Sequence, residues 1–232
     1  MNQPTNNSIE LIESLGGFDT PTISNAIEKL QVRDRAVGFT SSKLICQFPQ
    51  LKPMVGYAVT ATADSTTPGD KRPPQLEHLV ETLENAPQPA VLVIKHNGLD
   101  RQRCCLVGDM FTSALTKLGC IGIVTDANAR DRNGITEKTP DFHLFSTGWV
   151  ASHGYPTYVN FNTTVTICGL TISPGDLLHG DQSGLVSIPT HFASLLPEKA
   201  QIVRDEEQEY FDFLQNRFSI NGLKGRLRPD KP

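Results

Sequence analysis

Cysteine is scarce in this sequence, and its spacing excludes two kinds of small structural framework. There are five cysteines, an odd number, and no two of them form a CxxC pair. This pattern argues against a disulfide framework and against a zinc knuckle. We therefore expect reduced, mostly buried thiols and a cytoplasmic location.

Long hydrophobic runs and dense positive charge are also missing. No apolar run approaches the roughly 18 residues that a membrane-spanning helix needs. The first eight residues are polar and lack the basic and apolar segments of a secretory signal, so we expect a loose tail there. The net charge is −4 and no dense run of lysine and arginine occurs. We therefore expect neither a nucleic-acid partner nor a membrane partner.

Three signatures of well-known enzyme classes are absent. No GxGxxG fingerprint follows a predicted strand, no Walker phosphate-binding loop occurs, and no GxSxG elbow is present. Enzymes that depend on NAD, SAM or nucleotides are therefore disfavoured. What remains is an ordinary globular composition, 38% hydrophobic and 20% charged, over 232 residues. That length suits one large α/β domain or two small ones.

The most informative stretch runs from residue 108 to residue 131. After Asp109, apolar residues recur at helical spacing, and Gly119 is a typical helix stop because glycine adopts a left-handed backbone at little cost. The run from Cys120 to Thr125 is short, apolar and β-branched, which predicts a buried strand. The pair Arg130–Asp131 follows that strand. One helix and one strand should thus bring Asp109 and this pair to the same edge of a sheet.

The residue types gathered at this edge suit an anion and a hard cation. The start of a helix offers free N–H groups and a partial positive charge. Arginine can bind a carboxylate through two parallel hydrogen bonds, and Mg²⁺ prefers carboxylate oxygens. Judged from residue types alone, a simple surface ion pair of Arg130 with Asp131 is the commoner alternative.

Hydrophobic periodicity predicts helices and strands along the whole chain. Helices are expected to begin at Thr20, Pro73 and Thr190, with Pro197 interrupting the last one, and residues 132–141 are expected to be loop or a short helix. Strands are expected over 54–64, 90–95, 120–125, 143–146, 157–161, 165–167, 170–172, 177–180 and 185–188. Short connections in the second half indicate a partly antiparallel sheet. The fold class is therefore α/β, with a mixed central sheet flanked by helices.

Two further groups of polar residues have an ordinary structural interpretation. Asp176, His179 and Asp181 match a metal cluster by residue type. However, both aspartates lie in turns, where carboxylates accept hydrogen bonds from nearby N–H groups, and we favour that role. His96 is expected in a turn or at the surface, because no neighbouring histidine would complete a metal-binding pair.

Together these motifs resemble the family that joins the regulator of ribonuclease activity A (RraA) to the class II 4-hydroxy-4-methyl-2-oxoglutarate/4-carboxy-4-hydroxy-2-oxoadipate aldolases. Enzymatic members share an Asp, twenty intervening residues and then Arg-Asp, which is the spacing from Asp109 to Arg130–Asp131. The likeness continues through residues 174–181 and 184–189, and spans roughly residues 18–210. One departure is Asp126-Ala127, where many members have Asp-Gly.

The resemblance implies a swivelling α/β/α sandwich over residues 18–215, between an N-terminal tail or helix (1–17) and a C-terminal tail (216–232). It implies homotrimers or hexamers with active sites at subunit interfaces. It also implies a metal-dependent lyase that cleaves a C–C bond of a 2-oxo acid, releases pyruvate and decarboxylates oxaloacetate, with Mg²⁺ or Mn²⁺ as cofactor. The alternative is an RraA-like, non-catalytic regulator that binds a ribonuclease. Asp109, which that type lacks, favours the enzyme.

Roles for individual residues follow from the same resemblance. Arg130 would bind the keto oxygen of the pyruvyl unit, Asp131 would be the metal ligand, and Asp109 would contact a metal-held water as a proton relay. Backbone N–H groups of four consecutive residues would hold the substrate carboxylate: Gly108, Asp109, Met110 and Phe111. A glutamate from a neighbouring subunit would face the site, and Glu206 is our choice. The ordinary alternative for Glu206 is a solvated helix face.

Overall fold

The computed structural model of the protein describes residues 6–66, 68 and 76–227. The helices are α1 (Asn6–Leu15), α2 (Thr20–Leu30), α3 (Leu76–Glu84), α4 (Asp109–Lys117), α5 (Arg132–Lys138), α6 (Leu196–Asn216) and α7 (Ile220–Arg226), with 3₁₀ turns at Arg101–Arg103 and Thr190–Leu195. The strands are β1 (Ile45–Cys46), β2 (Met54–Asp64), β3 (Ala90–His96), β4 (Cys105–Val107), β5 (Cys120–Thr125), β6 (Asn128–Ala129), β7 (His143–Ser146), β8 (Thr157–Phe161), β9 (Val165–Ile167), β10 (Leu170–Ile172), β11 (Leu177–Asp181) and β12 (Gly184–Ile188).

One mixed sheet forms the centre of the molecule. Its strand order is β1-β7-β5-β3-β2-β11-β12, and β8 also pairs with β2. β2, β3, β5 and β7 are mutually parallel, whereas β1, β8, β11 and β12 join antiparallel. The predicted mixed sheet is therefore confirmed. Because parallel strands share one carboxyl edge, the segments that follow β3 and β5 emerge on the same side.

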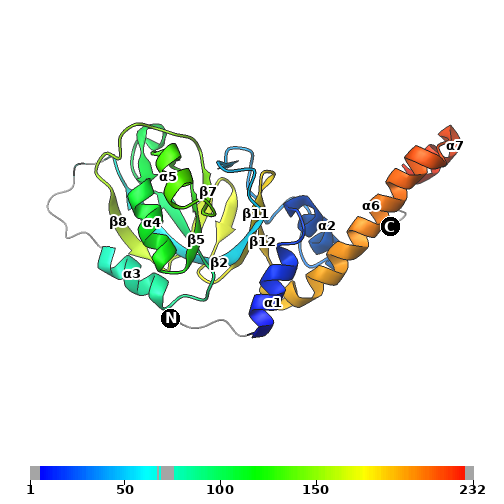
Figure 1. Cartoon of the computed structure of the whole chain (residues 1–232), viewed down its shortest axis with the longest axis horizontal. Helices are drawn as coiled ribbons and strands as arrows, with labels where there is room; N and C mark the ends of the chain where they lie inside the picture. The colour runs from blue at the N-terminus through cyan, green and yellow to red at the C-terminus, as the bar shows by residue number, and fades with distance from the viewer. Residues whose placement is uncertain (1–5, 67, 69–75, 228–232) are drawn as a thin grey trace.

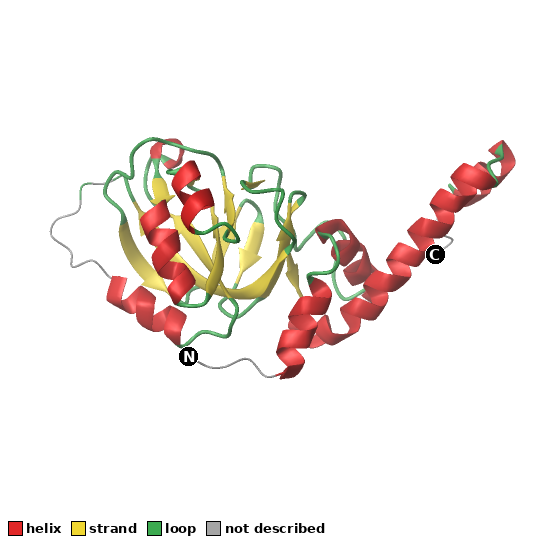
Figure 2. Ribbon diagram, viewed as in Figure 1, coloured by secondary structure: helices red, strands yellow, loops and turns green. Residues whose placement is uncertain are grey.

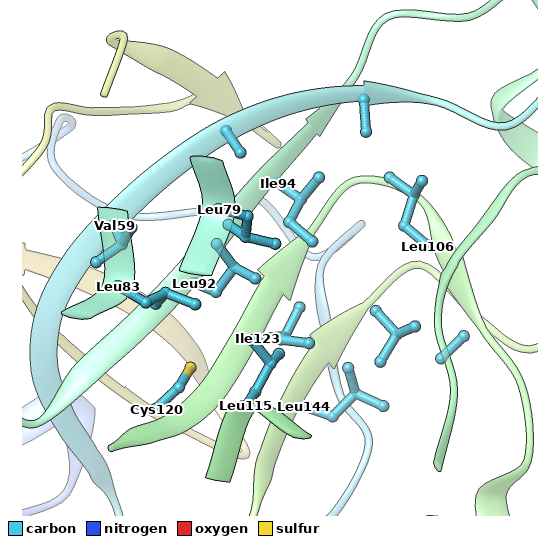
Figure 3. Close-up of a cluster of buried hydrophobic side chains, with 14 of the residues drawn as sticks. Val59, Leu79, Leu83, Leu92, Ile94, Leu106, Leu115, Cys120, Ile123 and Leu144 are labelled. Carbon is cyan, nitrogen blue, oxygen red and sulfur yellow. The ribbon is translucent and has the colours of Figure 1, made fainter. Parts of the chain in front are cut away.

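Two groups of helices pack against the outer face of this sheet (Figures 1 and 2). One group, α3 and α4, contacts strand residues whose side chains point outward, as Figure 3 shows for Leu92, Ile94, Ile123 and Leu144. The other group, α1, α2 and α6, covers the start of β2 and the strands β11 and β12. Side chains alternate between the two faces of a strand, so the intervening residues point inward.

The inner face encloses a core without helices. Strand residues such as Val91, Val93 and Val124 pack there against the β9–β10 hairpin, and among the described residues no helical side chain belongs to this cluster. The structure therefore differs from the expected sandwich, which would have helices on both faces of the sheet. The sheet curls around its own inner core, and the helices lie outside.

The N-terminal region is more ordered than the sequence suggests. Residues from 6 onward already form α1, and Leu15 at its end is fully buried in the second helical group. The cap of α2 is also one residue earlier than expected. The carboxylate of Asp19, rather than the Thr20 hydroxyl, accepts a hydrogen bond from Thr22 N–H at 2.7 Å. The helix start expected at Pro73 lies outside the described residues.

The C-terminal region also differs from its prediction. Thr190 begins a separate 3₁₀ turn, and Pro197 lies in the first turn of α6, where a missing N–H costs nothing, so it starts that helix rather than interrupting it. The expected tail after residue 216 contains α7, which together with the end of α6 projects from the body (Figure 1). Among the described helices, none combines the length and apolar composition that crossing a bilayer requires.

Candidate active site

A short ribbon of two strands joins the segments that carry the predicted site residues. β4 and β6 pair in parallel, and the backbone N–H of Arg130 donates to the carbonyl of Val107 at 2.9 Å. Gly108 follows β4 directly, and Arg130 follows β6 directly. The start of α4 and the pair Arg130–Asp131 therefore lie side by side.

A cavity of about 300 Å³ opens where these segments meet. This volume is at the small end of the range for small-molecule sites. Six of the predicted site residues line it: Gly108, Asp109, Met110, Phe111, Arg130 and Asp131. The structure thus brings together every predicted site residue except Glu206.

Asp131 has an unusual backbone that directs its carboxylate to the cavity. Its φ of 61° lies in the left-handed region, which aspartate tolerates better than most residues, and it precedes the first turn of α5. Its side chain makes no capping hydrogen bond and lies 3.0 Å from Arg130 Nε instead. A Cβ atom at Gly108 would lie only 2.9 Å from Asp131 Oδ2, so glycine leaves room for this carboxylate.

The first turn of α4 has backbone N–H groups that can donate to an anion, but not every N–H group that we predicted is free. Met110 N–H already donates to the Asp109 carboxylate at 2.7 Å, and Thr112 N–H donates to the Gly108 carbonyl. Within the described part of the chain, no acceptor bonds the N–H groups of Asp109 or Phe111. These two N–H groups are therefore available to an anionic ligand at the helix start.

Asp109 is held by two residues of α5 that sequence reasoning missed. Its Oδ2 atom binds Lys138 Nζ, and this hydrogen bond is the main cause that lowers the pKa of Asp109. A Cβ atom at Gly134 would lie 2.6 Å from the same oxygen, so only glycine lets the helix approach so closely. Gly134 and Lys138 are four residues apart, which puts them on one helix face. That spacing was the available signal, but it is informative only once residues 132–138 are known to be helical.

The carboxylates in the cavity fit a hard divalent cation that needs few protein ligands. Asp131 uses one oxygen toward Arg130, and no donor within the described residues contacts the other. Its side chain is 35% exposed, which leaves access to water. In the described ranges, no three His, Cys, Asp or Glu side chains could enclose a metal. Mg²⁺ suits such a site, because it keeps several waters and takes only one or two carboxylates.

Glu206 lies away from the cavity of its own chain. It is on α6 and binds Lys29 Nζ of α2 at 2.7 Å, in an exposed ion pair. This contact matches the ordinary surface role. A role toward a neighbouring subunit stays a prediction.

The structural interpretation of the second acidic group is confirmed. His179 is fully buried, with its ring nitrogens 3.0 Å from the Thr20 hydroxyl and 3.2 Å from the Leu15 carbonyl. Asp181 accepts from Thr20 N–H at 2.8 Å, and Asp176 accepts from a backbone N–H within its own turn. His179 and Asp181 hold the start of α2 to the sheet, and among the described residues the three side chains form no metal site.

The expectation for His96 is wrong. The residue ends β3 and is buried, and its backbone N–H donates to the carboxylate of Asp126 at 2.8 Å. Its ring lies 3.6 Å from Asp64, and burial lowers the pKa of His96. Strand β3 therefore extends one residue beyond the predicted end at residue 95, into a sequence that is typical of a turn.

Comparisons with curated proteins give partial matches. DlpA of Legionella pneumophila is 25% identical over 200 residues, which cover 85% of this chain but 30% of DlpA. A Halalkalibacterium halodurans protein that carries the provisional name of a 4-hydroxy-4-methyl-2-oxoglutarate aldolase is 30% identical over 112 residues, 48% of this chain and 51% of that protein. The chain thus spans about half or less of the length of these two relatives.

Two solved structures match nearly the whole chain, and a family model matches most of it. An uncharacterized protein from Pseudomonas syringae pv. tomato has a TM-score of 0.72 at 22% identity, over 97% of this chain and 99% of its own. RraAS2 of Streptomyces coelicolor, described as an unusual member of the RNase ES inhibitor RraA family, has a TM-score of 0.64 at 24% identity, over 93% and 99%. These likenesses show the fold. The model of the RraA-like family, described as Aldolase/RraA, matches residues 20–187, and the chain therefore belongs to that family.

Proposed function

We propose that the protein is a divalent-metal-dependent lyase that cleaves a C–C bond of a 2-oxo acid and releases pyruvate. The observation that carries the proposal is that Arg130, Asp131 and the start of α4 line the same cavity. Membership of the RraA-like family supports it, because a relative is provisionally named as an aldolase that acts on such an acid.

The proposed chemistry follows from where charge develops. Cleavage next to the keto group leaves a pyruvate enolate, so negative charge grows on the carbonyl oxygen. Arg130 donates hydrogen bonds to that oxygen, and the free N–H groups of Asp109 and Phe111 hold the substrate carboxylate. A divalent metal held by Asp131, when bound, supplies further electrostatic stabilisation of this charge. Through a water, the Asp109 carboxylate accepts the proton that the C4 hydroxyl loses and returns it to C3 of the enolate.

The first test is pyruvate release from oxaloacetate, measured with Mg²⁺ or Mn²⁺. Decarboxylation produces the same pyruvate enolate, so the proposed site should catalyse it without any need for a particular aldol substrate. We expect metal-stimulated release above the uncatalysed rate. The absence of release with both metals would contradict the lyase and favour the regulator-like binding module.

We expect Lys138→Met to shift the acid limb of the pH profile of kcat/KM toward higher pH. The hydrogen bond from Lys138 lowers the pKa of Asp109, so its loss raises that pKa, and Asp109 becomes protonated and inactive at a higher pH. The measurement is kcat/KM against pH for wild type and variant. Lys117→Met, at the exposed end of α4, is the matched control. An acid limb at the wild-type position would remove Asp109 from the proton-transfer role.

We also expect the protein to assemble as a trimer or a hexamer. Met110 at the cavity is 81% exposed, a large apolar side chain that a neighbouring subunit would shield from water. Light scattering should therefore give three or six times the 25.4 kDa mass of the chain. A fully active monomer would contradict the assembly and would remove Glu206 from the site.

A further inference from the structure

A histidine, His153, also lines the cavity. It lies in the segment 147–156, which joins β7 to β8. Near the start of this segment, the Val150 N–H donates to the carbonyl of Ala129 in β6 at 2.9 Å. Near its end, a backbone N–H donates to the carbonyl of Ser65 at 2.8 Å, just after β2. These two hydrogen bonds hold the segment, and His153 with it, between β6 and the end of β2.

The residue after His153 fixes the orientation of its ring. Gly154 has a φ of 59°, and a Cβ atom there would clash with the carbonyl oxygen of Ser65. The carbonyl oxygen of Gly154 accepts a hydrogen bond from Nδ1 of His153 at 2.8 Å. Because a carbonyl oxygen can only accept, Nδ1 carries a proton. The other ring nitrogen, Nε2, makes no hydrogen bond within the described residues and remains for a ligand.

The neutral and the protonated ring would bind different groups. With a proton on Nδ1, the neutral ring presents a lone pair at Nε2, whereas the cation presents a charged N–H donor there. A carboxylate pairs with the cation, and its negative charge in turn favours the protonated ring. Part of the cavity wall is apolar, with Leu76, Phe111 and Tyr158, so such a pair is less screened than at an open surface.

Several charged side chains lie around His153 in the described part of the chain. Those in the same cavity are Asp109, Arg130 and Asp131. On the other side of the segment, Asp100 and Arg103 line an adjacent cavity together with Ser152 and Gly154. In the proposed function the first three engage the pyruvyl end, the metal and the proton. Among the described lining residues, His153 is then the group left to pair with a charge on the rest of the substrate.

We infer that His153 selects substrates that carry a second carboxylate, by pairing its protonated ring with that group. The substrate class is then a 4-hydroxy-2-oxo acid with a carboxylate on C4, and this inference rests on the proposed pyruvate-releasing function. In the reaction the C3–C4 bond breaks and its electron pair forms the pyruvate enolate. The C4 hydroxyl loses its proton and becomes the carbonyl of a second 2-oxo acid, and C3 takes up a proton to give pyruvate. The paired carboxylate keeps its charge throughout, so His153 acts on specificity.

The test compares two substrates that differ in one group. 4-Hydroxy-4-methyl-2-oxoglutarate has a carboxylate where 4-hydroxy-4-methyl-2-oxopentanoate has a methyl group. Cleavage gives two pyruvates from the first and pyruvate with acetone from the second. The ratio of their kcat/KM values, counted per bond broken, cancels every ionisation that both reactions share. We expect the wild type to favour the dicarboxylate about tenfold or more at about pH 6, where an ordinary histidine is mostly protonated, and less at about pH 8.

Two variants separate this role from a structural one. His153→Gln should lose most of the preference at about pH 6 and keep kcat/KM for the methyl substrate within about twofold, because only the charged pair is removed. His153→Lys should restore the preference at both pH values, because lysine stays charged at about pH 8. His191→Gln is the matched control, since His191 is exposed in the 3₁₀ turn before α6 and does not line the cavity.

The possible outcomes are distinguishable. An unchanged preference in His153→Gln would show that another cation, from elsewhere in the chain or from a neighbouring subunit, holds the carboxylate, and would overturn the inference. An equal loss with both substrates, or a wild type without preference at the lower pH, would also overturn it. The absence of pyruvate from both substrates and from oxaloacetate would instead refute the proposed function.

Discussion

Arg130→Ala is expected to lower kcat for pyruvate release by about 10²–10³-fold or more, the usual effect of removing one donor to a developing oxyanion. Within the described residues, no other lysine or arginine lines the cavity. The fold should persist, because the side chain is one-third exposed and the backbone of residue 130 keeps its bond to Val107. The measurements are kcat on oxaloacetate and the midpoint of thermal unfolding.

Two further variants sharpen this result. Arg130→Lys should also be poor, because a lysine cannot reproduce the planar fork of arginine. Arg132→Ala is the matched control, since the Arg132 guanidinium lies over the ring of Trp149, 5.7 Å from its centre, and does not line the cavity. Wild-type turnover in Arg130→Ala would show that the assigned role is wrong.

The second large effect concerns the metal, for which Asp131 and Asp109 should behave differently. Asp131→Ala removes the only protein ligand that we propose, so activity should fall steeply and recover in part, if at all, at high Mg²⁺ or Mn²⁺. Asp109→Asn should still bind metal and pyruvate but turn over more slowly, by about 10²–10⁴-fold if proton transfer is lost. Its effect on metal affinity should be smaller, roughly 10–100-fold, as is usual for groups outside the inner sphere.

The measurement is a metal titration of pyruvate release after chelator treatment, for wild type and both variants. Asp141→Ala, an exposed carboxylate between α5 and β7, serves as the control for general charge effects. Identical titrations for Asp131→Ala and wild type would refute the assignment of the ligand. Undiminished activity in chelator would refute the metal mechanism, and the regulator-like binding module would then be the better interpretation.

The longer strands and the meeting point of the site could be predicted because their signals are local, whereas the short strands β1, β4 and β6 were not expected. β2 is rich in small and β-branched residues and β5 is a short apolar run, and the structure has both with the expected bounds. Gly119 ends α4 with a φ of 78°, as its position after the last apolar residue predicts. The start of α4 and the end of β5 were therefore expected to meet, because parallel strands share one carboxyl edge.

The remaining features depend on contacts between distant segments. α5 is short, polar and contains Gly134, so its sequence does not distinguish helix from loop, and its two contacts to Asp109 were missed. The burial of His96 depends on Asp126, thirty residues away. The curl of the sheet requires β8 to pair with the far half of β2, which nothing near either strand indicates. Burial and closure of this kind are tertiary effects that override local propensity.

The left-handed backbone of Asp131 also constrains how this protein can diverge. Position 131 has to satisfy a positive φ and, in the proposed site, supply a carboxylate. Glycine and asparagine accept the backbone but bring no charge, whereas glutamate brings the charge on a residue type that the left-handed region disfavours. Of these residue types, only aspartate meets both demands. Almost every substitution at position 131 should therefore impair the proposed site. An exchange of Asp131 to asparagine or glycine should therefore leave the turn into α5 intact and remove only the carboxylate of the proposed metal ligand.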